Sequence, residues 1–271
     1  MPAKPSPALK DTQNEPDHRK IAIDRVGVKS LRYPIQVRDR ASGQLQSTVG
    51  VFTLTVDLPH HFKGTHMSRF IEVLNAHGPV FQVDNIHAVL GLLLDRLDSE
   101  EAHIILEFPF FLEKAAPVSG SKGLLDYGVR FEAGAKRKGD FDFIITVTVP
   151  VTTLCPCSKS ISKYGAHNQR GEVNLAVRFH KHIWIEELIR LVESSASSEL
   201  YSLLKRPDEK FVTEHAFENP VFVEDLVRAI ASKAKANPEI TWFRVEAENF
   251  ESIHNHNAYA MVEGRGESAG K

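Results

Sequence analysis

The sequence is poor in cysteine, with two residues in 271, and this scarcity excludes a fold held together by several disulfide bonds. The two thiols, Cys155 and Cys157, flank a single proline. A disulfide bridge across one residue would be strained. We therefore expect two reduced thiols, the state that is usual in the cytoplasm.

The chain also lacks a strong charge of either sign and any long apolar run. Its formal net charge is -2 at pH 7, so no global basic field supports a nucleic-acid partner. No apolar run approaches the roughly 20 residues that span a bilayer. Residues 1–20 are polar and proline-rich, without the apolar core of a secretory signal. We expect a cytoplasmic protein with a disordered tail over residues 1–20 and no membrane partner.

What the sequence does contain is a repeated order of apolar patterns, strand-like where apolar residues alternate and helix-like where they recur at helical spacing. The first half reads ββααββ, and the second half repeats this order. The clearest segments of the first half are residues 49–57, 65–77, 84–97, 103–111 and 126–137. Those of the second half are residues 140–151, 171–180, 183–195, 220–236, 239–250 and 257–264.

Sequential antiparallel strands with paired helices predict an α+β architecture, with the helices on one face of each sheet. A boundary near residues 135–140 would divide the chain into modules of residues 21–137 and 138–271. The same boundary residues could equally form a hairpin inside one continuous sheet.

The segment "VPVTTLCPCSKSISKYGAHNQRGEV" places His167 twelve residues after Cys155. A thiolate and an imidazole suit a borderline-soft divalent metal such as zinc, and a catalytic zinc usually takes a third protein ligand and keeps one position open for water. A Cys–His nucleophile and a buried structural pair are the alternatives. Ser158, Lys159 and Lys163 in the following loop would suit an anion such as phosphate, although a solvated loop has the same composition.

A second polar cluster, "ENFESIHNHNAY", lies where two C-terminal strands meet. His254 and His256 are separated by one residue, so on a strand they would share a face. Two imidazoles and the carboxylate of Glu251 are typical of general acid–base chemistry near neutral pH. A polar hairpin tip is the structural alternative.

Two further acidic residues lie near the second helical segment of the C-terminal half, one before it and one in its first turn. Glu209 falls in a stretch that we expect to be irregular, between the two helices. Glu224 falls in the first turn of the helix after Pro220, where the helix dipole stabilises an acid.

Four segments together carry a resemblance to a known family: "TTLCPCSKSISKYGAHNQRGEV", "KGTHMSRF", "NPVFVEDLVR" and "ENFESIHNHNAYA". They strongly resemble the metal-dependent GTP cyclohydrolase I of type IB from bacteria. The resemblance implies a tunnelling fold with two ββααββ-type modules in tandem, in agreement with the order of the apolar patterns. It also implies a homotetramer whose subunits associate through their sheets into barrels, with active sites at the subunit interfaces.

The resemblance implies the reaction and the metal ligands as well. GTP and water would become 7,8-dihydroneopterin triphosphate and formate, the first step towards folate, although some family members serve tRNA modification through the same product. Cys155, His167 and Glu209 match the family's metal ligands, with water completing the site around zinc, manganese or iron. Metal-activated water would attack C8 of guanine, so Cys155 belongs to the catalytic machinery too.

Glu251, His254 and His256 match the family's C-terminal catalytic cluster. We expect His254 to protonate a ring nitrogen of guanine as the ring opens. Glu251 would orient a histidine and fix its tautomer.

Substrate contacts follow from the same resemblance and from charge. Glu224 matches the acid that anchors the guanine ring by accepting hydrogen bonds from its N–H groups. The triphosphate should meet cations, for which Lys63, Arg69 and Lys159 are the candidates. His66 lies between the first two and would contact phosphate or ribose.

Two other functions remain open from the residues. A tunnelling-fold nitrile reductase acting on a deazapurine would use the cysteine as covalent nucleophile together with a nicotinamide cofactor. A non-catalytic pterin- or purine-binding protein would hold a structural metal without an open position for water. A thiolate held by a metal is not free to attack, so metal ligation by His167 and Glu209 would argue against the reductase.

Overall fold

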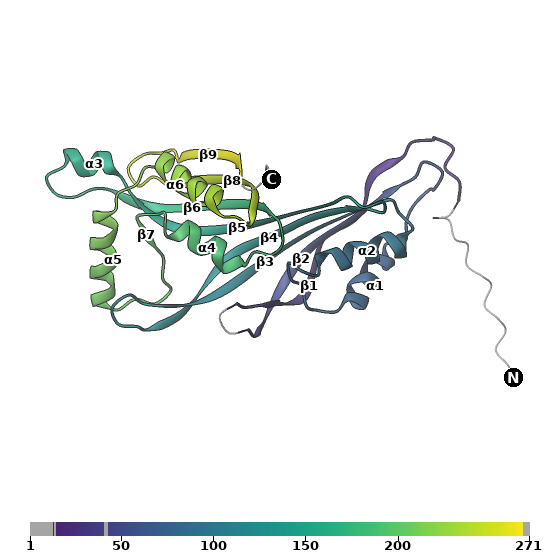
Figure 1. The fold of residues 1–271 in the computed structure, drawn as a ribbon, viewed down its shortest axis with the longest axis horizontal. Coiled ribbons are helices and arrows are strands. Elements are labelled where there is room, and N and C mark those ends of the chain that lie inside the picture. The colour runs from purple at the N-terminus through teal and green to yellow at the C-terminus, as the bar shows by residue number, and fades with distance from the viewer. Residues whose placement is uncertain (1–12, 14, 41–42, 268–271) are drawn as a thin grey trace.

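The computed structural model describes residue 13, residues 15–40 and residues 43–267. It is an elongated molecule in which helices lie along one long antiparallel sheet (Figure 1). Most of the predicted disordered tail lies outside the described residues. Of its described part, Gln13 and Glu15 accept backbone hydrogen bonds from Gly64 and Lys63, both at 3.1 Å.

The element order agrees with the α+β class predicted from the sequence. Strands pair in the order β1-β2-β3-β4-β5-β6-β8-β9, and the short β7 pairs with β5. The first half comprises β1 (Ile23–Arg38), β2 (Leu45–Leu58), α1 (Ser68–His77), α2 (Ile86–Leu97), β3 (Glu101–Ala115) and β4 (Lys122–Lys136). The second half comprises β5 (Phe141–Leu154), α3 (Pro156–Ile161), β6 (Asn168–Phe179), α4 (Ile185–Glu193), β7 (Ser198–Glu199), α5 (Arg206–Glu218), α6 (Val223–Ala236), β8 (Ile240–Asn249) and β9 (Ala258–Arg265).

The expected boundary at residues 135–140 is a hairpin between neighbouring strands of one sheet. β4 and β5 pair antiparallel from Gly128↔Thr148 to Ala135↔Phe141, so the sheet continues across it. Each half still carries two strands, helices and two more strands in that order. The division into two modules, at residues 21–137 and 138–271, stays a prediction.

One face of the sheet is apolar and carries the core. Because side chains alternate along a strand, residues in register across several strands share a face. The helices α2, α4 and α6 pack on this face, against strands of both halves. A single buried row in register crosses the sheet, from Phe52 through Leu106, Phe131, Ile145 and Val177 to Phe243.

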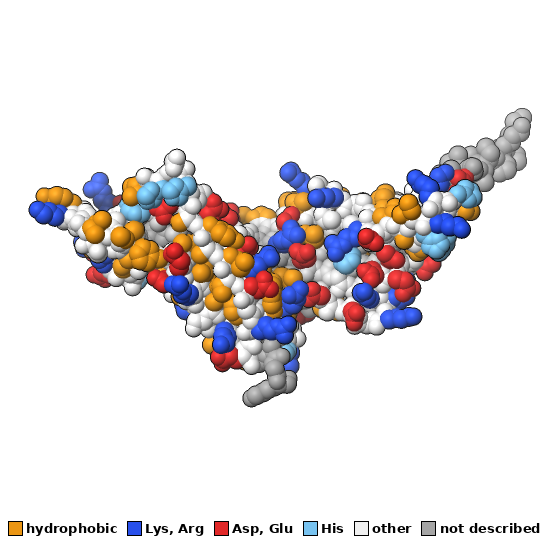
Figure 2. All heavy atoms as spheres, turned by 90° about the horizontal axis from the view of Figure 1, so that it is seen from above, with side chains coloured by type: hydrophobic (Ala, Val, Ile, Leu, Met, Phe, Trp, Pro, Cys, Tyr) orange, Lys and Arg blue, Asp and Glu red, His pale blue; other side chains and the backbone are white. Residues whose placement is uncertain are grey.

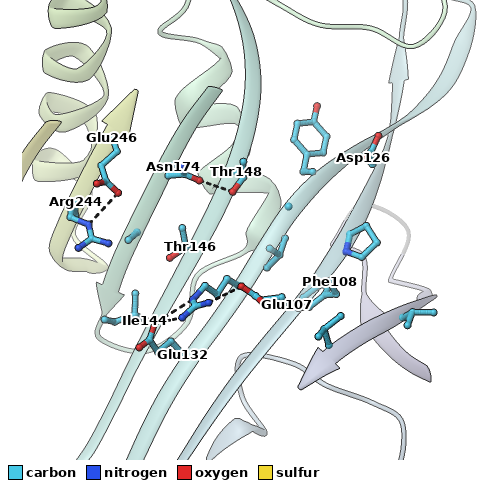
Figure 3. Close-up of a pocket in the computed structure, with 18 of the residues that line it drawn as sticks. Glu107, Phe108, Asp126, Glu132, Ile144, Thr146, Thr148, Asn174, Arg244 and Glu246 are labelled. Atoms are coloured by element: carbon cyan, nitrogen blue, oxygen red, sulfur yellow. Dashed lines mark hydrogen bonds and ion pairs between the residues drawn. The ribbon is translucent and has the colours of Figure 1, made fainter. Parts of the chain in front are cut away.

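The opposite face of the sheet is polar and hollowed (Figure 3). The hollow has a volume of about 830 Å³ and is lined by side chains of β2 to β6 and β8. Within it Arg130 donates to Glu107 at 2.7 Å and to Glu132 at 3.1 Å. The predicted site residues all lie in the described part of the chain, and none of them lines this hollow.

None of the helices within the described residues has the length and apolar character that crossing a membrane requires.

Candidate active site

Cys155 stands at the junction between β5 and a short helix that the sequence did not predict. The residue caps the N-terminus of α3, and its Sγ accepts a hydrogen bond from the backbone N–H of Ser158 at 3.3 Å. Pro156 suits the first helical position because it has no N–H group to leave unpaired there. The helix therefore fixes the Cys155 thiol, whereas Cys157 on its outer side is exposed.

His167 lies next to Cys155 because the loop after α3 closes onto the β5–β6 hairpin. The backbone N–H of Cys155 donates to the carbonyl of His167 at 3.1 Å. The Ser158 hydroxyl accepts from the backbone N–H of His167 at 3.2 Å and donates to the carbonyl of Cys155 at 3.1 Å. The structure thus brings together the backbones of two residues that the sequence places twelve residues apart.

The imidazole of His167 is surrounded by polar groups from two other segments. Its Nδ1 atom is 3.0 Å from Oε1 of Gln169 and 3.8 Å from Oε2 of Glu251. The side chains of His167 and Glu251 are only 13% and 11% exposed. Among the described residues, Oε2 of Glu251 is buried without a hydrogen-bond partner. Glu251 therefore faces His167, which the sequence did not indicate.

His254 and His256 lie in the segment that connects β8 to β9. This segment is neither strand nor helix, so the two histidines lie at the corner between the two strands and not on a strand face. Both imidazoles are exposed and stack on each other, with ring centroids 5.1 Å apart and planes inclined by 19°. The segment is held against the hairpin by a hydrogen bond from the N–H of Phe250 to the carbonyl of Arg170 at 2.8 Å.

Glu209 lies in the first turn of α5, where we had expected irregular chain. Its side chain is exposed. Within the described part of the chain, no three histidine, cysteine, aspartate or glutamate side chains are close enough together to hold a metal ion. The structure therefore pairs Cys155 with His167 and does not bring Glu209 into a three-donor cluster with them. Glu209 as a metal ligand stays a prediction.

The residue before Glu209 anchors the start of α5. Asp208 is fully buried and accepts hydrogen bonds from the backbone of Val118 (2.8 Å) and Lys205 (2.8 Å) and from the N–H and hydroxyl of Ser119 (both 2.7 Å). Burial by itself would raise the pKa of Asp208, but these hydrogen bonds outweigh it and hold the pKa well below its ordinary value. One carboxylate thus ties α5 to the β3–β4 loop.

Replacing Asp208 by asparagine should destabilise the fold at neutral pH. A depressed folded-state pKa contributes stability above the unfolded pKa of about 4, and this contribution disappears as the pH falls below it. The difference in unfolding free energy between wild type and Asp208→Asn should therefore be large at pH 7 and shrink below about pH 4. Urea unfolding at both pH values measures it, with the exposed Asp225→Asn as control. An equal difference at the two pH values would contradict this explanation.

Glu224 occupies the first turn of α6, as predicted, and is exposed. The start of α6 lies beside the end of β5, because the N–H of Val221 donates to the carbonyl of Leu154 at 3.0 Å. Leu154 immediately precedes Cys155. Glu224 is therefore carried by a helix that begins next to the strand end from which the thiol projects.

Lys159 contacts the end of α5. Its Nζ donates to the carbonyl of Phe217 and lies 4.4 Å from the centroid of the Phe217 ring. The ammonium group therefore joins α3 to α5, an interaction with which a phosphate would compete.

The remaining cationic candidates lie in the other half of the molecule. Lys63 pairs with Glu15 at 3.0 Å, and Arg69 in α1 accompanies His66 in the turn that opens the helix. In Figure 1, α1 and α2 stand at the opposite end of the long axis from α3. One chain therefore does not bring Lys63, His66 and Arg69 to Cys155.

Apolar side chains are exposed around the α3 end of the molecule. Figure 2 shows hydrophobic side chains gathered at that end, among basic side chains and histidines. Ile161 at the end of α3 is 80% exposed, and Tyr164 in the loop after α3 is 96% exposed. Ile253, between β8 and β9, is 65% exposed. Apolar surface of this kind is typical of a face that another molecule covers.

Comparison with known proteins gives a match over nearly the whole chain. The family model described as "Type I GTP cyclohydrolase folE2" matches residues 9–260. A protein named GTP cyclohydrolase FolE2 from Akkermansia muciniphila is 60% identical over 257 residues, covering 94% of this chain and 97% of that protein. Its namesake from Magnetococcus marinus is 56% identical over 256 residues, covering 94% and 96%.

Solved structures with the same fold are far more distant in sequence. A uricase from Bacillus fastidious superposes with a TM-score of 0.54 at 7% identity, covering 91% of this chain and 95% of that one. A urate oxidase from Bacillus sp. TB-90 gives 0.51 at 8% identity, covering 90% and 100%. These similarities show the fold alone, and they confirm the predicted tunnelling fold.

Proposed function

This chain belongs to the type I GTP cyclohydrolase family of the folE2 type, and from this premise we propose how its residues carry the reaction. It is a GTP cyclohydrolase I, which converts GTP and water into 7,8-dihydroneopterin triphosphate and formate, the first step of tetrahydrofolate biosynthesis. The prediction made from four sequence segments is thereby confirmed.

The family is metal-dependent, and we propose that Cys155 and His167 hold the divalent ion. The support is their chemistry and their placement: the Cys155 thiol is fixed at a helix start by the N–H of Ser158, the backbone N–H of His167 donates to the hydroxyl of the same serine, and the buried carboxylate of Glu251 lies beside the imidazole. Thiolate and imidazole suit zinc, manganese or iron, the three candidates. When bound, such an ion activates water for attack at C8 of guanine.

Glu209 is the proposed third ligand. Since the described residues hold no three-donor cluster, the proposal requires that α5 move towards Cys155 or that a second copy supply the carboxylate. Asp208 fixes the start of α5 and would therefore determine which positions the carboxylate of Glu209 can occupy.

The other proposed roles belong to side chains that are free to meet a substrate. The exposed carboxylate of Glu224 would accept two N–H groups of the guanine ring, which orients C8 towards the thiol end of β5. His254 would deliver a proton to the ring nitrogen as the ring opens, and His256, stacked on it, would limit its motion. Glu251 contacts His167 rather than either of these, so we assign it to orienting His167.

We further propose that the enzyme acts as a homo-oligomer, expected to be a tetramer in the cytoplasm, with active sites between subunits. The proposal is supported by the distance between two parts of the proposed site. In one chain, Cys155 lies beside α3, whereas Lys63 and Arg69 lie just before and within α1, at the opposite end of the molecule (Figure 1). An oligomer that brings the α1 end of one subunit to the α3 end of another would complete the site.

Complementation tests that shared site. Cys155→Ala protein is mixed under exchange conditions with protein carrying Lys63→Ala and Arg69→Ala. Each preparation alone should be nearly inactive, whereas the mixture should regain activity in about a quarter of the sites, since each half of a site is intact in half of the subunits. A mixture of Cys155→Ala with His167→Ala is the control, because both defects lie at the same end. No recovery in the first mixture would contradict the shared site.

Turnover itself is tested with the metal-loaded enzyme and GTP, following formate release and the fluorescence of the oxidised pterin, with zinc, manganese and iron in parallel. Formate together with pterin is expected. Formate alone would contradict conversion to the pterin, because the guanine ring would open without the later ring closure, and neither product with any metal would contradict the activity.

A further inference from the structure

Gln169 lies between His167 and a buried threonine, and the sequence drew attention to neither Gln169 nor the threonine. Oε1 of Gln169 is 3.0 Å from Nδ1 of His167, and Nε2 of Gln169 donates to the hydroxyl of Thr153 at 2.9 Å. Thr153 is completely buried and Gln169 is 8% exposed. The two face each other in register on β5 and β6, so the sheet itself fixes this chain of contacts.

The contacts of Nδ1 decide which ring nitrogen of His167 carries the proton. Nδ1 faces two oxygen atoms, Oε1 of Gln169 at 3.0 Å and Oε2 of Glu251 at 3.8 Å. A carboxylate can only accept hydrogen bonds, and in the described part of the chain Oε2 of Glu251 is buried without a donor. A proton on Nδ1 satisfies this arrangement, whereas a lone pair there would face two oxygens. The neutral imidazole then keeps its lone pair on Nε2.

We propose that Gln169, held by Thr153, is a positioning residue that keeps His167 in the Nδ1-protonated tautomer and leaves Nε2 as the metal-binding atom. The inference deepens the proposed function and rests on it to the extent that His167 is a metal ligand. Metal-binding histidines usually donate the other ring N–H to an oxygen, and loss of that partner costs about 10- to 100-fold in metal affinity.

The tautomer is tested first, in full-length protein without metal. Protein labelled with ¹⁵N-histidine is examined by NMR, and the His167 signals are assigned by their absence in His167→Asn. The Nδ1–H form should dominate in wild type and in Gln169→Glu, which keeps an acceptor oxygen. In Gln169→Leu the population of the Nε2–H form should increase. Dominance of the Nε2–H form in wild type would overturn the proposal, whatever the metal does.

Metal affinity is tested next, with cobalt(II) titrated against a chelator and followed by the cobalt–thiolate absorption of Cys155. Gln169→Leu should bind about 10- to 100-fold more weakly, with the same absorption at saturation. Gln169→Glu should bind at least as tightly as wild type, and Thr153→Val, which leaves Gln169 in place, should lose less than Gln169→Leu. Unchanged affinity in Gln169→Leu would overturn the proposal.

The two measurements separate this inference from the proposed metal site. If wild type shows no cobalt–thiolate absorption, the metal site proposed at Cys155 and His167 fails, and the NMR result alone decides the tautomer. Thermal unfolding of each variant shows whether it folds. The rescue by Gln169→Glu distinguishes loss of the acceptor from general damage to the hairpin, because both replacements fill the same buried position.

Discussion

Cys155→Ala protein should release no formate from GTP and should retain no metal after gel filtration. Cys155 supplies one of the two donors that we propose for the metal, and its thiol is fixed at the start of α3, a position that the exposed Cys157 two residues later does not occupy. Metal activation of water contributes several kcal/mol, so its loss should lower the rate by more than about a thousandfold.

Cys157→Ala is the matched control for that experiment. Cys157 is two residues away, exposed, and on the outer side of the same short helix. This variant should keep its metal and most of its activity. Full activity in Cys155→Ala, or equal losses in the two variants, would show that the thiol of Cys155 does not hold the catalytic metal.

Glu224→Gln should lose most of its preference for guanine. If the carboxylate accepts two N–H groups of the ring, removing its charge should cost about 3 kcal/mol, which corresponds to a loss of about a hundredfold in kcat/KM for GTP. Inosine triphosphate, which lacks the exocyclic amino group, should be a poor substrate for wild type. The ratio of kcat/KM between the two nucleotides should fall towards one in the variant.

Asp225→Asn controls for this change, because Asp225 is an exposed acid in the same helical turn as Glu224. It should leave both the rate and the nucleotide preference unchanged. If Glu224→Gln lowers kcat/KM for GTP and for inosine triphosphate by the same factor, Glu224 does not contact the guanine amino group.

The sheet and its covering helices could be predicted because their apolar patterns are regular. Alternation in β2 places Phe52, Leu54 and Val56 on the buried face, and α2 buries a continuous apolar stripe. The period of the pattern alone therefore identifies these elements. It does not decide whether the β4–β5 connection separates two sheets or continues one.

α5 escaped prediction because it has almost no buried stripe. Of its residues only Asp208 and Ala216 are buried, while Phe211 and Phe217 are exposed. The helix is held by a buried carboxylate at its start rather than by an apolar face. Such an anchor leaves no periodic signal in the sequence.

In the candidate site too, contacts between residues that are close in the sequence could be predicted, whereas contacts that depend on the whole fold could not. The neighbourhood of Cys155 and His167 follows from a loop that connects adjacent strands, and the sequence indicated it. Gln169 went unnoticed because a lone glutamine has no recognisable chemistry until its neighbours are known, although it lies only two residues after His167, at the start of β6. The separation of α1 from α3 depends on the whole length of the sheet, which no local pattern records.

X-ray absorption spectroscopy of the zinc-loaded enzyme tests the central claim most directly, namely that Cys155 and His167 hold the metal. The account predicts one sulfur at about 2.3 Å and nitrogen or oxygen atoms at about 2.0–2.2 Å from zinc, with the sulfur lost in Cys155→Ser. A first shell without sulfur in wild type, or a sulfur that persists in Cys155→Ser, would contradict it.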